Sequence, residues 1–584
     1  MQANELGEPR SDDSGAATVP AGASAGQPDG QVGLARRDQA SLALRATLTL
    51  GARHPALQGL LALAVYLAVF IVTYAGPLLR HPGVPLVYQR NPDPNFYIWS
   101  LRWWPYAISH GLNPLHSSQI GAPAGYDLAW TTPTAAVAVL LAPVTEWFGP
   151  VASFNLTLVL AAPVSGWAAF VAARRLTGRF WAALAAGPVY GFAWYETGET
   201  SVGHPNLITI MLLPLMVYLV LLWRDGTLRP VPFVALQAVA MTAEFYVFNE
   251  TFVWMTVLGA VLLLIGFLIA SPVERSEVAR LARLLGVAWL VALAFISPTL
   301  VYMLRHSPGT FTKALPRNSL DLIDLVTPWS SIALLVITLA LAIIAWRSRL
   351  TRLLVISFIL VVAVAAGPDL VIDRHVLGPL PWAGLWYQAF TRSAQPVRII
   401  IFANLLLAVI VAVWLAMPGR SRLLLALRWI LALAAVAGLV ALLPGLTRNY
   451  AGGNRAGTVR PRQTVPTFFT SGEYRDYLRP GETVVVVSDR ANAGMLFQAY
   501  TNFYFRLAGG FVNSSLNDPT GQPAPVAALH HPAPGDDRRF LAYARRTGVG
   551  AVIVEREWAM PWMSVFPRMG LHGTRVGDVI IYRT

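Results

Sequence analysis

Acidic and basic side chains in this chain collect in the loops between long apolar runs, where they could carry out acid–base chemistry. Asp93 stands between two prolines near the start of the first of these loops. A second loop, YETGETSVGHPN (195–206), supplies Glu196, Glu199 and His204. A carboxylate that takes the proton of a hydroxyl acts as a general base, and ionisable groups at membrane depth are costly and usually functional. These residues therefore predict a site of proton transfer.

Basic side chains in later loops have the chemistry to hold a departing phosphate. Arginine gives bidentate hydrogen bonds to phosphate, and a cation beside a leaving group stabilises its developing charge. Arg392 and Arg398 would also serve as arginines that snorkel beside a span, and Lys313 and Arg317 as contacts for anionic lipid. The candidate phosphate-binding residues are Lys313, Arg317, Arg374, Arg392 and Arg398. No HxxH- or DxD-type spacing is present, so we assign no metal ligands and leave a divalent cation open as a cofactor.

Structural roles compete with the acid–base interpretation. Asp is favoured at turns and helix N-caps, so Asp93 could simply cap the helix that follows it. His204 lies between Gly203 and Pro205 at an expected helix start, and capping explains it as well as function does. The aromatic segment after Asp93 predicts a helix in the membrane–water interface, anchored by Trp99, Trp103 and Trp104.

The composition is that of a polytopic membrane protein. Of 584 residues, 55% are hydrophobic and 13% charged, and the mean hydropathy is +0.52, whereas soluble domains have about 25% charged residues. The net charge of +14 is explained by arginines in cytoplasmic loops and at anionic lipid. Nucleic-acid binding would need a soluble basic face with interleaved aromatic residues, which is absent. The chain has no cysteine and therefore no disulfide framework.

Apolar runs of spanning length must position the loops. Residues 1–55 are polar and predict a disordered cytoplasmic tail, and residues 56–446 form the transmembrane domain. Arginine clusters in alternate loops place the long first loop, residues 80–130, outside the cytoplasm. After the first run at 60–79, further runs lie near 131–149, 151–173, 180–195, 205–223, 231–248, 251–271, 284–304, 331–346, 351–367, 399–416 and 423–444. Two runs, 131–149 and 151–173, lie between the outward first loop and the next cytoplasmic arginine cluster, where the topology requires an odd number of crossings. We therefore expect 131–149 to be re-entrant or folded against the bundle, which gives about eleven spans.

Residues 447–584 differ in composition from the runs before them. Strand-like segments lie at 483–488, 550–555 and 579–582, and residues 536–547 have helical spacing. Alternation of helix and strand predicts a small α/β domain, which the topology places outside the cytoplasm. The region has no Walker or GxGxxG phosphate loop, so we expect no nucleotide there.

Four segments carry a resemblance to a known family: GHPNLITIMLLPL (203–215), SLDLIDLVTPW (319–329), LPWAGLWYQAFTRSAQPVRIIIFANLLLAV (380–409) and MLFQAYTNFYFRLAGGFVN (495–513). With the early Asp of a long first loop and the outward C-terminal domain, they resemble the GT-C superfamily, and within it a set of bacterial GT-C-like membrane proteins. The resemblance implies a polytopic α-helical bundle, a polyprenyl-phosphate sugar donor and a catalytic acid in the first loop. That acid would be Asp93, which stands alone where the family often has paired acidic residues.

The residues and the resemblance together predict a glycosyltransferase in a bacterial plasma membrane. It would move a sugar from a polyprenyl-phosphate donor to an extracytoplasmic cell-wall glycan, glycolipid or protein. Asp93 would be the general base, and Glu196, Glu199 and His204 would shape the acceptor site or support the base. The alternative is a non-catalytic lipid-linked glycan transporter or cell-envelope assembly factor. A ligase or acyltransferase that relies on His204 or His375 is a third interpretation.

Overall fold

The structure is a computed structural model that describes residues 54–76, 91–132, 134–306, 319–326, 329–387, 394–419, 421–443, 465–488, 492–512, 523–530, 533–556 and 562–584. The chain divides into two compact units, Met1–Gln58 and Gly59–Thr584. Of the first unit only residues 54–58 are described, so the tail predicted at residues 1–55 lies almost wholly outside the described residues. All described residues from Gly59 on belong to the second unit.

Eight helices of the described residues are long and apolar enough to cross a bilayer. They comprise α2 (Pro55–Phe70) with η1 (Ile71–Ala75), α7 (Pro150–Thr177), α10 (Pro205–Ile208) with α11 (Leu212–Arg224), α12 (Pro230–Val247), α13 (Asn249–Ile269), α14 (Pro272–Arg305), η4 (Pro396–Ile399) with α17 (Ile400–Ala416), and α18 (Arg422–Leu442). Three other predicted runs form shorter helices, α8 (Phe180–Gly191), α15 (Trp329–Ala345) and α16 (Arg349–Ala365). The chain is thus a multi-pass membrane protein, and eleven crossings stay a prediction.

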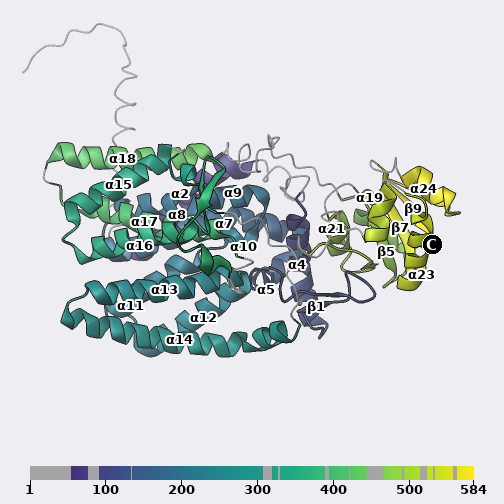
Figure 1. Cartoon of the computed structure of the whole chain (residues 1–584), viewed down its shortest axis with the longest axis horizontal. Coiled ribbons are helices and arrows are strands. Elements are labelled where there is room, and N and C mark those ends of the chain that lie inside the picture. The colour runs from purple at the N-terminus through teal and green to yellow at the C-terminus, as the bar shows by residue number, and fades with distance from the viewer. Residues whose placement is uncertain are drawn as a thin grey trace, which may run out of the picture. The chain divides into compact units, whose positions relative to one another are not determined.

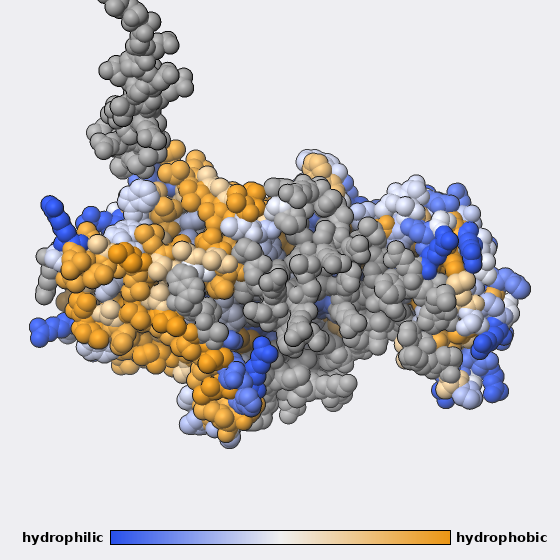
Figure 2. All heavy atoms as spheres, turned by 90° about the horizontal axis from the view of Figure 1, so that it is seen from above, coloured by the Kyte–Doolittle hydropathy of each residue, from blue (hydrophilic) through white to orange (hydrophobic). Residues whose placement is uncertain are grey.

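The bundle has a buried centre and a periphery that is apolar on its outside. Helices α7, α8 and α17 contact one another, while α12 contacts α11, α13 and α14, which run side by side in Figure 1. Large apolar side chains such as Leu268, Leu290 and Phe295 are exposed on α13 and α14. Figure 2 shows hydrophobic residues covering this helical part. Such an apolar outer surface suits contact with lipid tails, because these are apolar as well.

The long first loop is folded onto the bundle. It contains α4 (Asp93–Ser109), β1 (His116–Ser117) and β2 (Tyr126–Asp127), and α5 (Ala135–Leu140) and α6 (Ala142–Phe148) follow it. The run predicted at 131–149 is broken into these last two helices, which have six and seven residues. At about 1.5 Å per residue, neither is longer than about 11 Å. They contact α4 and α7 instead, as expected for a run folded against the bundle.

The tryptophans of α4 are buried and do not face the membrane. The rings of Trp99 and Trp103 stack with centroids 5.4 Å apart, and Phe503 meets both edge-on at 5.7 and 5.6 Å. Trp104 is buried as well. The prediction that these side chains anchor the helix in the interface is therefore wrong. Phe503 lies some four hundred positions further along the chain, so local sequence could not reveal this contact.

The C-terminal region contains a five-stranded sheet in the order β6-β5-β7-β9-β8. Its strands are β5 (Thr483–Val487), β6 (Arg506–Leu507), β7 (Val549–Glu555), β8 (Gly573–Val576) and β9 (Val579–Arg583), of which β5 is parallel to β6 and β7. Side chains alternate between the faces: one cluster joins Val484 to α21 (Ala493–Tyr500) and α4, the other joins Val485 to α23 (Asp536–Thr547) and α24 (Trp562–Arg568). The strands predicted at 483–488, 550–555 and 579–582 and the helix at 536–547 are confirmed.

Candidate active site

Asp93 is the first residue of α4, but its carboxylate does not cap that helix. Asn91 provides the local hydrogen bonds: its Oδ1 accepts from the Asp93 N–H at 3.1 Å, and its Nδ2 donates to the Val202 carbonyl at 3.0 Å. The Asp93 side chain is 40% exposed. The capping alternative for Asp93 is therefore wrong, and its carboxylate is available for other contacts.

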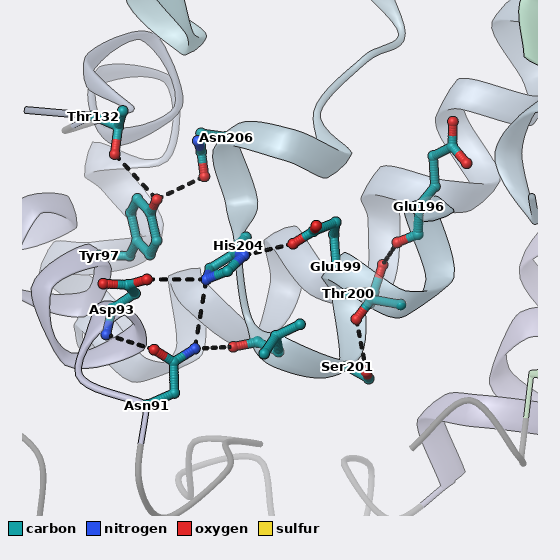
Figure 3. A network of polar contacts seen from close by, with 12 residues as sticks. Asn91, Asp93, Tyr97, Thr132, Glu196, Glu199, Thr200, Ser201, His204 and Asn206 are labelled. Atoms are coloured by element: carbon teal, nitrogen blue, oxygen red, sulfur yellow. Dashed lines mark hydrogen bonds and ion pairs between the residues drawn. The ribbon is translucent and has the colours of Figure 1, made fainter. Parts of the chain in front are cut away.

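His204 joins Asp93 to Glu199 in a row of three ionisable side chains (Figure 3). The Nε2 atom of His204 lies 3.1 Å from Oδ2 of Asp93, and its Nδ1 atom lies 2.5 Å from Oε2 of Glu199. The Glu199 side chain is only 9% exposed. The row thus leads from a buried carboxylate, through an imidazole, to a carboxylate at the surface of the loop.

A tight turn carries His204 across to α4. Helix α9 (Trp194–Val202) ends at Gly203, whose φ of +79° is left-handed and favours glycine. A Cβ at Gly203 would lie 3.0 Å from Cγ of Pro94 and 3.1 Å from Cζ of Phe154. Pro205 then begins α10, where its fixed φ suits a first helical position. The glycine and the proline therefore place His204 between the end of one helix and the start of another.

The two carboxylates decide the charge of His204. Burial alone would lower the pKa of His204, but Glu199 and Asp93 together raise it to about 10. The ring is therefore protonated at neutral pH, and both of its nitrogens donate hydrogen bonds. Oδ1 of Asp93 has no hydrogen-bond partner among the described residues. A ligand hydroxyl could reach this oxygen without displacing the His204 contact.

Tyr97 forms a second polar contact one helical turn after Asp93. Its hydroxyl donates to Oδ1 of Asn206 at 2.7 Å and lies 3.1 Å from Oγ1 of Thr132 (Figure 3). Burial, and then Asp93, raise the pKa of Tyr97, so it stays a neutral donor. Sequence reasoning missed Tyr97 and Asn206. The four-residue spacing from Asp93 to Tyr97 was a usable signal, because it places both on one helix face.

Glu196 does not join the row that the other predicted residues form. Asn404 of α17 donates from Nδ2 to both carboxylate oxygens of Glu196 at 3.0 Å. Figure 3 shows Glu196 pointing away from His204. Of the four acid–base candidates, the structure brings Asp93, Glu199 and His204 together and turns Glu196 into the bundle.

Arg398 is the predicted phosphate-binding residue that lies nearest to this chemistry among those described. It forms an ion pair with Glu250 and stacks over the Phe248 ring, with 5.3 Å between the guanidinium carbon and the ring centroid. Its charge opposes the rise in the pKa of Tyr97, which places it within electrostatic reach of the Asp93 row. Because this ion pair is partly buried and held within the protein, it differs from an arginine that snorkels to the membrane surface.

The other predicted cations are elsewhere. Arg374 lies in the turn between β3 (Asp369–Ile372) and β4 (His375–Pro379), where its backbone N–H donates to Oδ2 of Asp321 at 2.6 Å. Lys313, Arg317 and Arg392 lie outside the described residues. No group of three His, Asp or Glu side chains in the described part of the chain could hold a metal ion, and the divalent cation stays a prediction.

The C-terminal region holds the opposite side of α4. The indole N–H of Trp99 donates to Oε1 of Gln498 at 2.7 Å. The amide of Gln498 in turn donates to the carbonyls of Gln119 at 2.7 Å and Phe505 at 2.9 Å. Gln498 is fully buried, so this one side chain connects α4, the first loop and the loop before β6.

Comparison with solved structures identifies the fold. No protein-family model and no curated protein matches the chain. The arabinofuranosyltransferase AftD from Mycobacteria superposes with a TM-score of 0.57 at 15% identity over 90% of this chain, and a mutant form of it with 0.56 at 16% identity over 90%. The aligned regions cover 39% and 41% of those chains, so this chain spans about two fifths of the AftD length. ArnT from Cupriavidus metallidurans bound to undecaprenyl phosphate aligns with a TM-score of 0.49 at 12% identity, over 90% of this chain and 97% of its own. The AftD superpositions show that this chain shares its fold with a known arabinofuranosyltransferase, which agrees with the fold that the sequence resemblance implied.

Proposed function

We propose that the chain is a membrane glycosyltransferase that moves a sugar from a polyprenyl-phosphate donor to an extracytoplasmic acceptor. The observation that carries the proposal is the Asp93–His204–Glu199 row at the first residue of α4. A fold alone does not determine a reaction, but a partly exposed carboxylate with one oxygen held and the other unpaired suits a general base. The acceptor is a cell-wall glycan, a glycolipid or a protein.

In this mechanism Asp93 takes the proton of the acceptor hydroxyl as that oxygen bonds to the anomeric carbon of the sugar. The bond from that carbon to the donor phosphate breaks, and its electron pair leaves with the phosphate. His204 holds the Asp93 carboxylate in one orientation, and the buried Glu199 holds His204. The base is thereby oriented before substrate arrives, which lowers the cost of reaching the transition state.

Arg398 is our first candidate for stabilising the departing phosphate. Its guanidinium is partly buried, and Nε has no hydrogen-bond partner among the described residues. Glu250 and the Phe248 ring hold the side chain in place, and a fixed cation in a site with little water acts strongly on developing charge. Lys313, Arg317, Arg374 and Arg392 remain in the pool of proposed phosphate-binding residues.

The proposed topology follows from this chemistry and from the arginine pattern. The N-terminal tail, residues 1–55, is cytoplasmic, and the transmembrane domain covers residues 56–446. The loop at residues 80–130 and the α/β domain at 447–584 are extracytoplasmic. This arrangement puts Asp93 on the side of a plasma membrane where lipid-linked sugars meet cell-wall acceptors.

The test is turnover of a panel of radiolabelled polyprenyl-phosphate sugars by the full chain in nanodiscs. Asp93→Asn should lower turnover by about 100- to 10,000-fold, because general base catalysis contributes this much. Asp373→Asn is the matched control: Asp373 is an exposed residue with a φ of +50°, which asparagine also adopts. Donor binding without turnover, unchanged by Asp93→Asn, would favour the transporter or assembly factor.

A further inference from the structure

A cavity lies beside α4, away from the Asp93 row. It has a volume of about 280 Å³ and is open to solvent. It is lined by Arg102 of α4, by residues 145, 146 and 148–152 around the α6–α7 turn, and by Ala499 and Tyr500 of α21. Arg102 follows Asp93 by nine residues, so on a helix it lies about 13 Å further along and about half a turn round. The cavity is thus separate from the proposed catalytic centre.

An ion pair between Arg102 and Glu146 forms one wall of this cavity. Nη1 of Arg102 lies 2.9 Å from Oε1 of Glu146, and Nε donates to Oδ1 of Asn502 at 2.9 Å. The Arg102 side chain is 12% exposed, whereas that of Glu146 is 54% exposed. Oε2 of Glu146 has no hydrogen-bond partner among the described residues. The wall therefore offers a fixed donor group beside a free acceptor oxygen, with no net charge.

This charge balance selects the class of ligand. A phosphate or carboxylate that approached Arg102 would also meet the Glu146 carboxylate, and like charges that close repel. A neutral compound with adjacent hydroxyl groups meets no such penalty, because one hydroxyl can accept from the guanidinium while its neighbour donates to Glu146.

Aromatic rings complete the lining. Tyr500 is 37% exposed, and its hydroxyl has no hydrogen-bond partner among the described residues. Phe148 also lines the cavity and is exposed. An aromatic ring with a polar tip offers apolar area to the C–H face of a sugar and a hydrogen bond to its edge. A volume near the lower bound of ordinary ligand sites, about 300 Å³, suits a short saccharide.

We propose that this cavity binds a neutral sugar residue of the acceptor glycan, away from the residue that receives the transferred sugar. The inference rests on the proposed function for its choice of an acceptor glycan. The sugar belongs either to a soluble oligosaccharide or to a glycolipid headgroup. Trp147, which follows Glu146 on α6, is exposed, and tryptophan is enriched at membrane interfaces.

Binding is measured on the full chain in nanodiscs with the Asp93→Asn substitution, so that no turnover interferes. The probes are neutral pentasaccharides of arabinose, mannose, galactose and glucose, uronic-acid pentasaccharides, and nanodiscs with and without a neutral glycolipid. We expect a neutral glycan to bind, free or as glycolipid, and Tyr500→Ala and Glu146→Gln each to weaken it about tenfold or more. Tyr500→Phe should retain most of the binding because it keeps the ring. Glu277→Gln, at an exposed glutamate of α14, is the control and should change nothing.

Three results would overturn the inference: no neutral glycan binds in either form, acidic glycans bind better than neutral ones, or Tyr500→Ala and Glu146→Gln leave binding intact. Binding that needs the glycolipid identifies a headgroup as the source, and binding of free pentasaccharide identifies the glycan chain. A protein that binds glycan through Tyr500 but transfers no sugar refutes the proposed function and keeps the cavity. Turnover without Tyr500-dependent glycan binding supports the proposed function and refutes the binding role of the cavity.

Discussion

Replacing Gln498 by leucine is expected to destabilise the junction between α4 and the C-terminal sheet. Gln498 is fully buried and makes three hydrogen bonds, one from the Trp99 indole and two to the backbone carbonyls of Gln119 and Phe505. Leucine fills nearly the same volume but can make none of them. The substitution therefore isolates the polar contacts from the packing.

The magnitude follows from the groups left behind. Each buried donor or acceptor that loses its partner costs about 1–3 kcal/mol. The Gln119 carbonyl keeps a hydrogen bond from the Leu507 N–H, so the Trp99 indole and the Phe505 carbonyl are the groups left behind, and at the lower end they cost about 2 kcal/mol together. For folded regions of about 150–250 residues, 1 kcal/mol shifts Tm by about 2–4 °C, which predicts a fall of about 4–8 °C. Because Trp99 lies on the helix that begins at Asp93, turnover should fall together with the stability of the junction.

Thermal unfolding in nanodiscs, followed by tryptophan fluorescence, measures the effect. Gln119→Leu is the matched control, because Gln119 contributes its backbone carbonyl to the junction and its side-chain oxygen has no partner among the described residues. The control should keep Tm within about 1–2 °C, as ordinary substitutions away from polar networks do. Equal Tm values for Gln498→Leu and Gln119→Leu would refute the reasoning.

The Asp93 row makes two further predictions. The folded pKa of His204, about 10, lies above its ordinary value of 6.5, so the stability from its charge is complete below about pH 6.5 and lost as pH rises toward 10. Glu199→Gln removes the largest cause of the raised pKa, so the fall in Tm should still begin near pH 6.5 but should level off at a lower pH and be smaller in total than in the parent protein; identical Tm–pH curves would contradict this. Gly203→Ala should cost at least about 1–2 kcal/mol, because a left-handed residue with a Cβ is strained and Pro94 stands 3.0 Å from that Cβ. A Gly203→Ala protein that unfolds and turns over like its parent would show that the turn does not position His204.

Much of the fold was predictable because it depends on local patterns. Apolar runs of spanning length became helices, and the β-branched runs predicted at 483–488 and 550–555 became β5 and β7. The prediction failed where a local pattern had two explanations. The tryptophans of α4 have the composition of interface anchors, but Phe503 and Gln498 cover Trp99 and bury it. Hydropathy records what a side chain prefers and not which partner satisfies it.

For the candidate site, the sequence by itself determined that Asp93, Glu196, Glu199 and His204 were the residues to consider, because acids and histidines are costly beside apolar runs. Only the tertiary structure decided that Glu199 faces His204 while Glu196 faces Asn404. The two glutamates are three residues apart on α9, so spacing could not separate them. The contact of His204 with Asp93 joins residues 111 positions apart. It exists because the turn at Gly203 packs against Pro94, and the packing of distant segments is not encoded in any short stretch of the chain.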